Sequence, residues 1–340
     1  MTETRSRISR CVIRGSINCD EYFHVDHIVR PGETSSSSDY ERRVGGKGAN
    51  QAVAIARAGG AVSIYGNLGQ DGLWIKDAMQ SWGIEVQGLA VSEGSTGRAL
   101  IQVDRHGENS IILSPGTNYS ELHEQEFKKR GENWFPDCSH LLVQNEIRIQ
   151  SSQYAIKNAQ KASVFVNPSP LPSSEEIKVF PWDRVDWVIV NADEAKELAA
   201  AFGISVDFSM SEVVQLLALN PKFQHTSIVC TLGADGVLAV LQINSDKRPC
   251  TLIQVPAGKI LNTVINTTGA GDTFTGYFVK GIMEYGPDAK LGKEIGGEEV
   301  RKVLQTCVQA AAMCVEKAGT IDSIPTLEDV RERLVLATVS

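Results

Sequence analysis

The sequence has no apolar run approaching the roughly 18 residues that a membrane-spanning helix requires. Its first ten residues, MTETRSRISR, lack the apolar centre of a secretory signal, and their arginines and serines leave an organelle presequence as the alternative. The seven cysteines are scattered and never form a C-x-x-C pair, which disfavours both disulfides and a zinc site. We therefore expect a protein of a reducing compartment, the cytoplasm with the nucleus as an alternative.

An excess of positive charge is also missing. The 340 residues contain 33 lysines and arginines against 41 aspartates and glutamates, for a formal net charge of −8. A protein that holds nucleic acid through its phosphates needs basic residues to neutralise them, so a nucleic-acid partner is not expected. With 42% hydrophobic and 22% charged residues, the chain suits one large α/β domain or two smaller ones, and small-molecule chemistry is the favoured function.

Two common nucleotide-binding patterns are absent from the glycine-rich stretch VGGKGANQAVAIARAG. Lys47 is followed by Gly48 and not by Ser or Thr, which excludes a Walker P-loop. The stretch also lacks the G-x-G-x-x-G pattern of a dinucleotide-binding fold.

Short β-branched runs alternate with helical patterns along most of the chain. Runs such as CVIRGSIN, SIYGNLG and HLLVQNEI end in polar or glycine-bearing loops, and helical segments such as GANQAVAIARAGG lie between such runs. This order predicts an α/β fold with a doubly wound, mostly parallel sheet flanked by helices. Two insertions, about 19–44 and 97–115, have short alternating patterns and predict a small antiparallel β lid on a single domain of residues 1–340.

The stretch INTTGAGDTFTGYF combines a flexible turn, a carboxylate and the start of an apolar helix. Gly269, Ala270 and Gly271 let the backbone turn sharply and present amide groups at a helix N-terminus, which favours an anion hole for phosphate. Asp272 would stand at the same helix start as a general base for an attacking hydroxyl. The alternative is that Asp272 only caps the helix.

Together, GGKGANQAVA and NTTGAGDTFTGYF resemble the N-terminal and C-terminal motifs of the PfkB carbohydrate kinases, and within that family the ribokinases. The likeness extends from GSINCD near the start of the chain to KAGTIDSIP near its end. Fructose and nucleoside kinases of the family typically carry a different residue at the position of Lys47. The resemblance implies a ribokinase-like fold and ATP-dependent phosphorylation of D-ribose at its 5-hydroxyl. The alternatives are a kinase for another sugar or a nucleoside, and a binding protein that has lost turnover.

The same resemblance assigns roles to individual residues. Sugar hydroxyls would be bound by polar side chains and glycines, which are Asn18, Asp20, Gly45, Gly46, Lys47, Asn50, Glu146 and the base Asp272. Carboxylates and amides at the carboxyl ends of strands can accept hydroxyl protons, which suits a polyol. ATP would contact Asn191, Thr231, Gly233, Gly236 and Gly271.

Two metal ions and a dimer are also implied by the resemblance. Glu194, in the N-x-x-E element NADE, would position Mg²⁺ through water, because magnesium prefers oxygen ligands and retains water. Elements of a monovalent-cation site are matched by Asn266, Thr268, Gly319 and Ser323. Many ribokinases carry aspartate at the position of Asn266, so K⁺ activation is expected with a weaker ligand here. The homodimer would pair its lids across a two-fold axis.

Overall fold

The computed structural model describes the chain except for residues 1–7, 122–124, 126–134, 136, 244–249 and 340. Within the described residues, nine strands form the main sheet in the order β13-β12-β11-β10-β9-β8-β1-β4-β5. These strands are β1 (Arg10–Arg14), β4 (Ala61–Leu68), β5 (Glu85–Val91), β8 (His140–Val143), β9 (Ser163–Val166), β10 (Trp187–Asn191), β11 (Ser227–Thr231), β12 (Val237–Leu241) and β13 (Thr251–Val255). Neighbours are parallel from β5 to β11, and β12 and β13 are antiparallel additions at one edge.

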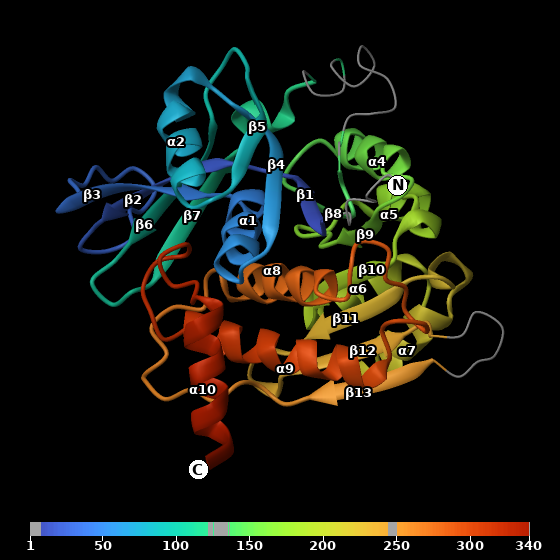
Figure 1. Cartoon of the computed structure of the whole chain (residues 1–340). Coiled ribbons are helices and arrows are strands. Elements are labelled where there is room, and N and C mark those ends of the chain that lie inside the picture. Colours follow the sequence, from blue (N-terminus) through green and yellow to red (C-terminus); the bar gives the residue numbers. More distant parts are fainter. Residues whose placement is uncertain (1–7, 122–124, 126–134, 136, 244–249, 340) are drawn as a thin grey trace, which may run out of the picture.

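Helices cover both faces of this sheet (Figure 1). They are α1 (Lys47–Arg57), α2 (Leu73–Ser81), α4 (Ile149–Asn158), α5 (Ser174–Val179), α6 (Ala192–Ala201), α7 (Met210–Leu219), α8 (Ala270–Met283), α9 (Gly297–Cys314) and α10 (Leu327–Val339). Along β1, Cys11 and Ile13 face the core under α1, α8 and α9, whereas Val12 faces the core under α4 to α7. The alternation of strands and helices predicted this parallel sheet, and its strands have nearly continuous apolar sequences because both faces are buried. No helix in the described part of the chain is long and apolar enough to span a membrane.

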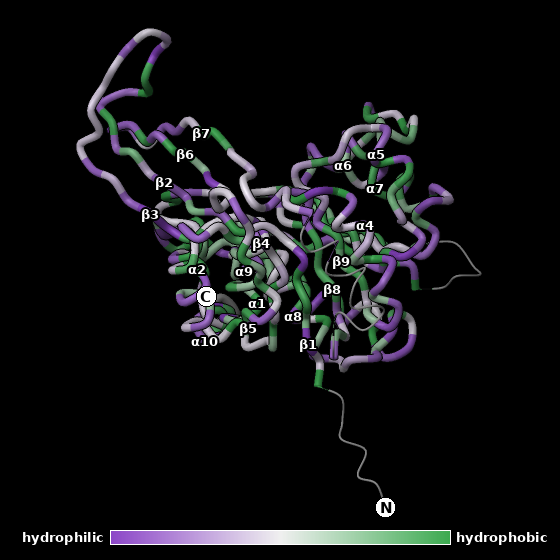
Figure 2. The backbone as a smooth tube through the Cα atoms, turned by 90° about the horizontal axis from the view of Figure 1, so that it is seen from above, coloured by the Kyte–Doolittle hydropathy of each residue, from purple (hydrophilic) through white to green (hydrophobic). Residues whose placement is uncertain are grey.

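A second sheet forms the lid, which extends away from the body in Figure 2. Its order is β3-β2-β6-β7, and its strands are β2 (Asn18–His24), β3 (Asp39–Gly45), β6 (Gly97–Val103) and β7 (Asn109–Ser114). Each insertion makes one antiparallel hairpin, but the central pair, β2 with β6, is parallel. The two hairpins confirm the predicted antiparallel lid, and its parallel centre, which was not predicted, arises because the first strand of each hairpin leaves the body in the same direction.

Candidate active site

Most of the predicted site residues gather at the carboxyl edge of the main sheet, near the starts of α1 and α8. The last residue of β10, Asn191, and the last residue of β11, Thr231, lie at this edge. A cavity of about 120 Å³ opens there and is lined by Lys47, Asn167, Ser169, Ile189, Val190, Asn191, Glu194, Thr231, Gly269, Gly271, Asp272 and Thr275. Ligands of open parallel sheets bind beyond the carboxyl ends of the strands, and this cavity lies at such a place.

Asp272 lies in the first turn of α8 and is 8% exposed. Its Oδ2 accepts a hydrogen bond from Asn50 Nδ2 at 2.9 Å, and its Oδ1 accepts one from Gln51 Nε2 at 2.8 Å. The two helices approach closely because Gly276 has no side chain; a Cβ there would lie 2.4 Å from the Cβ of Ala54. Asp272 is therefore oriented by hydrogen bonds from a second helix, α1. A residue that only caps α8 would not need these bonds.

Gln51 was missed by the sequence analysis, although it holds the site together. It is fully buried, donates to Asn167 as well as to Asp272, and its Oε1 accepts a hydrogen bond from Gln144 Nε2. Asn167 in turn donates to the carbonyl of Ile189 in β10. The network thus fixes Asp272 relative to the ends of β8, β9 and β10. The sequence signal was present, because Gln51 follows Asn50 at the start of a glycine-initiated helix and polar residues follow both β8 and β9.

The start of α8 has the geometry of an anion-binding turn. Gly269 adopts the left-handed conformation at φ 84°, which a residue with a side chain rarely adopts. A Cβ added to Gly271 would meet no atom within 4 Å, so the backbone at this position borders open space. Ala270 is the first residue of the helix, and its amide donates within the turn to Thr267. Gly269 and Gly271 line the cavity, so the positive end of the helix dipole lies beside it.

Asp20 is buried on β2, and its carboxylate packs closely against the backbone of Gly45. Gly45 pairs with Asn18 in the neighbouring strand, and a Cβ on Gly45 would lie 2.0 Å from Asp20 Oδ2, so glycine leaves room for this carboxylate. Burial, followed by the charges of Glu146 and Asp272, raises the pKa of Asp20 to about 7. Within the described protein, Asp20 Oδ1 and Asn50 Oδ1 are buried acceptors without a hydrogen-bond partner. Buried acceptors of this kind need a donor, and a polyol offers several.

Other predicted sugar-site residues surround this position. Asn18 Oδ1 accepts a hydrogen bond from Asn118 Nδ2 at 2.8 Å, so Asn118 is a further residue that the sequence analysis missed. Gly46, at φ 86°, begins α1, and Glu146 Oε2 accepts from the backbone N–H of Lys47 at 2.9 Å. Glu146 therefore fixes the start of α1 as well as presenting a carboxylate.

Lys47 is half-buried among carboxylates. Burial alone would lower its pKa, but the charges of Asp272, Glu146 and Glu194 raise it above the ordinary value for lysine. The ammonium group therefore remains protonated between the predicted sugar residues and the predicted phosphate turn.

On the nucleotide side, Asn191 and Glu194 cap the start of α6 reciprocally. The Asn191 N–H donates to Glu194 Oε2, and the Glu194 N–H donates to Asn191 Oδ1, each at 2.9 Å. Both residues also line the cavity, as does Thr231. Gly233 and Gly236 lie in the turn between β11 and β12, outside the lining of that cavity. Packing alone explains the glycine at position 236, because a Cβ there would lie 2.2 Å from the carbonyl oxygen of Val255.

Cys314 brings two of the four predicted cation-site residues together. Its sulfur lies 3.0 Å from Ser323 Oγ and 4.0 Å from the carbonyl oxygen of Thr268. Asn266 Oδ1 accepts a hydrogen bond from the Thr268 N–H at 2.8 Å, so the amide clamps the turn that leads into α8. Gly319, at φ 86°, lies apart from this contact, since a Cβ there would meet Arg43 Nη1 at 2.5 Å.

Comparisons with known proteins show the family of this chain. The family described as pfkB family carbohydrate kinase matches residues 9–327. The chain belongs to this family. A ribokinase from Haemophilus influenzae is 34% identical, with 95% of this chain and 97% of the relative covered.

Two solved structures of PfkB-family ribokinases share the fold. Ribokinase from Cryptococcus neoformans in complex with ADP has a TM-score of 0.81 at 39% identity, covering 96% of this chain and 99% of that one. Arabidopsis thaliana ribokinase complexed with ribose and ATP has a TM-score of 0.76 at 25% identity, again covering 96% and 99%.

Proposed function

We propose that this PfkB-family enzyme is a ribokinase, which transfers the γ-phosphate of ATP to the 5-hydroxyl of D-ribose and releases ribose 5-phosphate and ADP. One observation carries the proposal: a buried carboxylate, Asp272, is oriented by Asn50 and Gln51 beside a glycine turn, and unpartnered buried acceptors lie next to it. The relatives named ribokinase, which match nearly the whole chain, support the same substrate.

In this proposal Asp272 accepts the proton of the ribose 5-hydroxyl as its oxygen attacks the γ-phosphorus, and the bond to the β-phosphate oxygen breaks. The amides at the Gly269–Gly271 turn stabilise the negative charge that spreads over the transferred phosphoryl group. Lys47, held protonated by its carboxylate neighbours, adds positive charge at the same place. Asp20 and Asn50 would accept hydrogen bonds from other hydroxyls of the sugar and so fix its orientation.

The residues at the start of α6 fit a magnesium ion that arrives with ATP. A carboxylate has about four lone-pair sites, so Glu194 can hold a metal-bound water while one oxygen caps the helix. Bound Mg²⁺ would neutralise charge on the phosphates. Glu194 borders the same cavity as Gly271 and Asp272, which places oxygen ligands beside the proposed phosphate site.

Variants of two glutamates separate the sugar site from the metal site. Glu146→Ala is expected to raise the KM for ribose by about 10- to 100-fold, the loss of 1.5 to 3 kcal/mol from a hydrogen bond to a charged group. Glu194→Ala is expected to lower kcat and to raise the Mg²⁺ concentration needed for turnover. Steady-state kinetics with varied ribose and Mg²⁺ measure both effects. Glu197→Ala, an exposed position on the same helix as Glu194, is the matched control. An unchanged ribose KM in Glu146→Ala would remove that residue from the sugar site.

We also propose a K⁺ ion near Asn266, Thr268 and Ser323. The Asn266 amide already accepts a hydrogen bond from Thr268, and an aspartate could keep that bond while adding a charge. Asn266→Asp is therefore expected to lower the half-activating K⁺ concentration by about fivefold, which corresponds to about 1 kcal/mol of added attraction. The measurement is ADP production across a K⁺ titration in buffer free of Na⁺ and K⁺. Full activity of the natural protein without K⁺ would contradict a cation requirement, and equal midpoints would contradict the role of Asn266.

The lid supports a homodimer as a further proposal. β7 is an edge strand of the lid sheet, and it exposes Ile111, Ile112 and Leu113 by 48%, 60% and 60% of their surface. An exposed apolar edge strand invites pairing with another chain. A two-fold pairing of lids would cover this row of side chains in both copies.

For the cellular location we propose the cytoplasm, because all seven cysteines are free thiols, which a reducing compartment favours.

A panel of sugars and nucleosides at fixed ATP tests the proposed substrate, with ADP release as the signal. We expect ribose to give the highest kcat/KM. A higher value for another sugar or a nucleoside would assign the enzyme to that substrate, and no ADP release with any acceptor would indicate a binding protein.

A further inference from the structure

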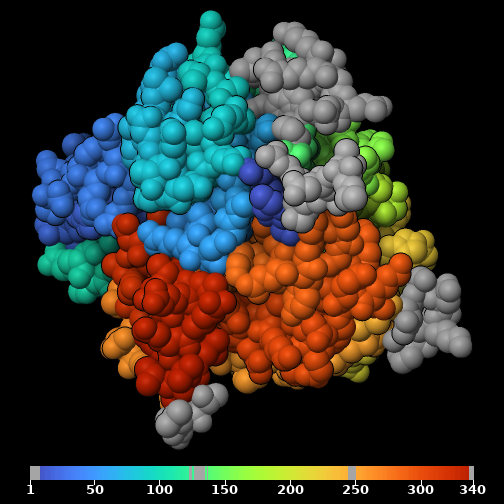
Figure 3. All heavy atoms as spheres, viewed as in Figure 1, coloured from blue at the N-terminus to red at the C-terminus, as the bar shows by residue number. Residues whose placement is uncertain are grey.

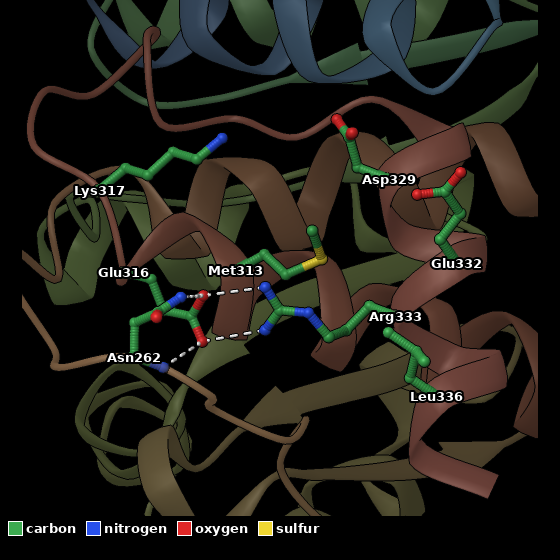
Figure 4. Close-up of a pocket in the computed structure, with 8 residues that line it drawn as sticks. All are labelled: Asn262, Met313, Glu316, Lys317, Asp329, Glu332, Arg333 and Leu336. Atoms are coloured by element: carbon green, nitrogen blue, oxygen red, sulfur yellow. Dashed lines mark hydrogen bonds and ion pairs between the residues drawn. The ribbon is translucent and has the colours of Figure 1, made fainter. Parts of the chain in front are cut away.

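Glu316 joins three separate segments of the chain through one buried carboxylate. It follows α9, and its side chain is 4% exposed. Its Oε1 accepts hydrogen bonds from the backbone N–H groups of Leu261 at 2.6 Å and Asn262 at 3.2 Å. Its Oε2 accepts one from Asn262 Nδ2 at 3.0 Å. In Figure 4, Asn262 and Arg333 converge on Glu316, and all three are among the residues that line a cavity of about 280 Å³.

The third segment is α10, which supplies Arg333. This guanidinium donates from both terminal nitrogens to the two oxygens of Glu316, at 3.0 and 3.1 Å, in the bidentate geometry of a strong ion pair. Burial opposes ionisation, but the hydrogen bonds from Arg333, Leu261 and Asn262 lower the pKa of Glu316 to about 2. The carboxylate is therefore charged at any physiological pH. α10 is attached to the body by the fully buried Val330, and in Figure 3 its surface, in red, adjoins the orange segment that contains α8 and α9.

The loop held by Glu316 has little apolar burial of its own. Ile260, Leu261, Val264 and Ile265 are all large hydrophobic residues with 43% to 60% of their surface exposed. The loop is instead hydrogen-bonded along its length to the end of α9 and the turn after it. Gln309 bonds both the N–H and the carbonyl of Lys259, and the carbonyl of Val315 accepts from the N–H groups of Ile265 and Asn266.

This loop continues directly into the phosphate turn. Asn266 clamps the Thr268 N–H, and Gly269 begins α8 immediately afterwards. A displacement of the loop at Asn262 therefore reaches both the proposed cation ligands and the amides of the anion hole. The hydrogen bonds from Val315 and within the turn couple the position of the loop to that of the turn, so a shift of one is expected to shift the other.

We propose that Glu316, clamped by Arg333, is a positioning residue for the phosphate turn, so that the C-terminal helix α10 controls how well this enzyme binds ATP and its activating cation. The inference rests on the proposed function, because it takes the turn at Gly269–Gly271 as the site of the ATP phosphates. It assigns a role to α10, none of whose described side chains lines the cavity at the sheet edge.

Three variants test the proposal. Arg333→Met removes the clamp, and Glu316→Gln keeps the shape of the side chain but removes its charge. Asn262→Asp changes an exposed loop residue and places a second carboxylate against Glu316, so it loosens the loop with little risk to folding. Arg331→Met, at an exposed position on the same helix, is the matched control.

The measurements are calorimetric binding of Mg²⁺–ATP without any sugar, the half-activating K⁺ concentration, and the melting temperature. We expect the three variants to raise the ATP dissociation constant and the K⁺ midpoint by about three- to tenfold, with the ribose KM unchanged and Arg331→Met equal to the natural protein.

Lower melting temperatures with unchanged ATP affinity and K⁺ midpoint would show a purely structural ion pair and overturn the proposal. If instead the natural protein binds ATP but phosphorylates no ribose, the substrate assignment fails, while the binding data still decide the role of Glu316. A natural protein that binds no ATP would contradict both.

Discussion

Replacing Asp272 with asparagine is expected to lower kcat by at least about 100-fold, the lower end of the effect of a positioned general base. The asparagine has the same shape, but it cannot take the proton of the attacking hydroxyl. ATP binding should stay close to that of the natural protein, because the phosphate turn precedes this side chain and does not depend on its charge. Steady-state kinetics give kcat, and calorimetry gives the ATP affinity.

Asp183→Asn, at an exposed position, controls for the loss of one negative charge. An Asp272→Asn enzyme that keeps more than half of the natural turnover would show that this carboxylate only supports the start of α8. A large loss of ATP affinity with unchanged kcat would place Asp272 at the nucleotide and not at the sugar hydroxyl.

Gln51→Leu should damage both the fold and the chemistry. The change leaves Asp272 without one donor, and it leaves the amide of Gln144 and the side-chain oxygen of Asn167 without their partners. Each unsatisfied buried polar group costs about 1 to 3 kcal/mol, so we expect the free energy of unfolding to fall by about 3 kcal/mol or more. Because Asp272 also loses its orientation, kcat should fall in the fraction that remains folded.

Denaturant unfolding and kinetics at a temperature well below the transition measure these two effects. Gln80→Leu, an exposed position at the end of α2, tests the same change without a buried network. Equal unfolding free energies for Gln51→Leu and the natural protein would show that solvent or a rearranged side chain satisfies the three partners.

The sequence was informative wherever function depends on backbone geometry. Glycines at 45, 46, 269 and 271 mark close approach, left-handed turns or open space, and such requirements can be recognised in a single motif. Alternating strands and helices also predicted that polar residues after different strands would meet, because parallel strands end at one edge.

Other parts of the site depend on how distant segments pack. The position of Gln51 beside Asn50 was visible in the sequence, but its three partners were not, since they come from the ends of β8 and β9 and from α8. The role proposed for Glu316 likewise depends on a loop and a helix that are distant from it in the sequence. The parallel centre of the lid escaped prediction for the same reason, because β2 and β6 are far apart in the chain.

Asn266 can have two roles, one as a structural clamp of the turn before α8 and one as a ligand of a cation. Its amide clamps the turn before α8, which is sufficient reason for an asparagine at this position. Its carbonyl oxygen has a second lone pair, so it can also coordinate a cation at the same time. The K⁺ titration of Asn266→Asp separates these roles, because only the cation responds to the added charge.

The transfer of phosphate from ATP to the 5-hydroxyl of ribose can be followed directly. Purified protein, Mg²⁺–ATP and D-ribose are incubated with K⁺, and the products are quantified by phosphorus NMR over time. We expect ribose 5-phosphate and ADP in equal amounts, with no product when the 5-hydroxyl is replaced by hydrogen. Phosphate on a different hydroxyl, or ADP formed with free phosphate in place of a sugar phosphate, would contradict the proposed reaction.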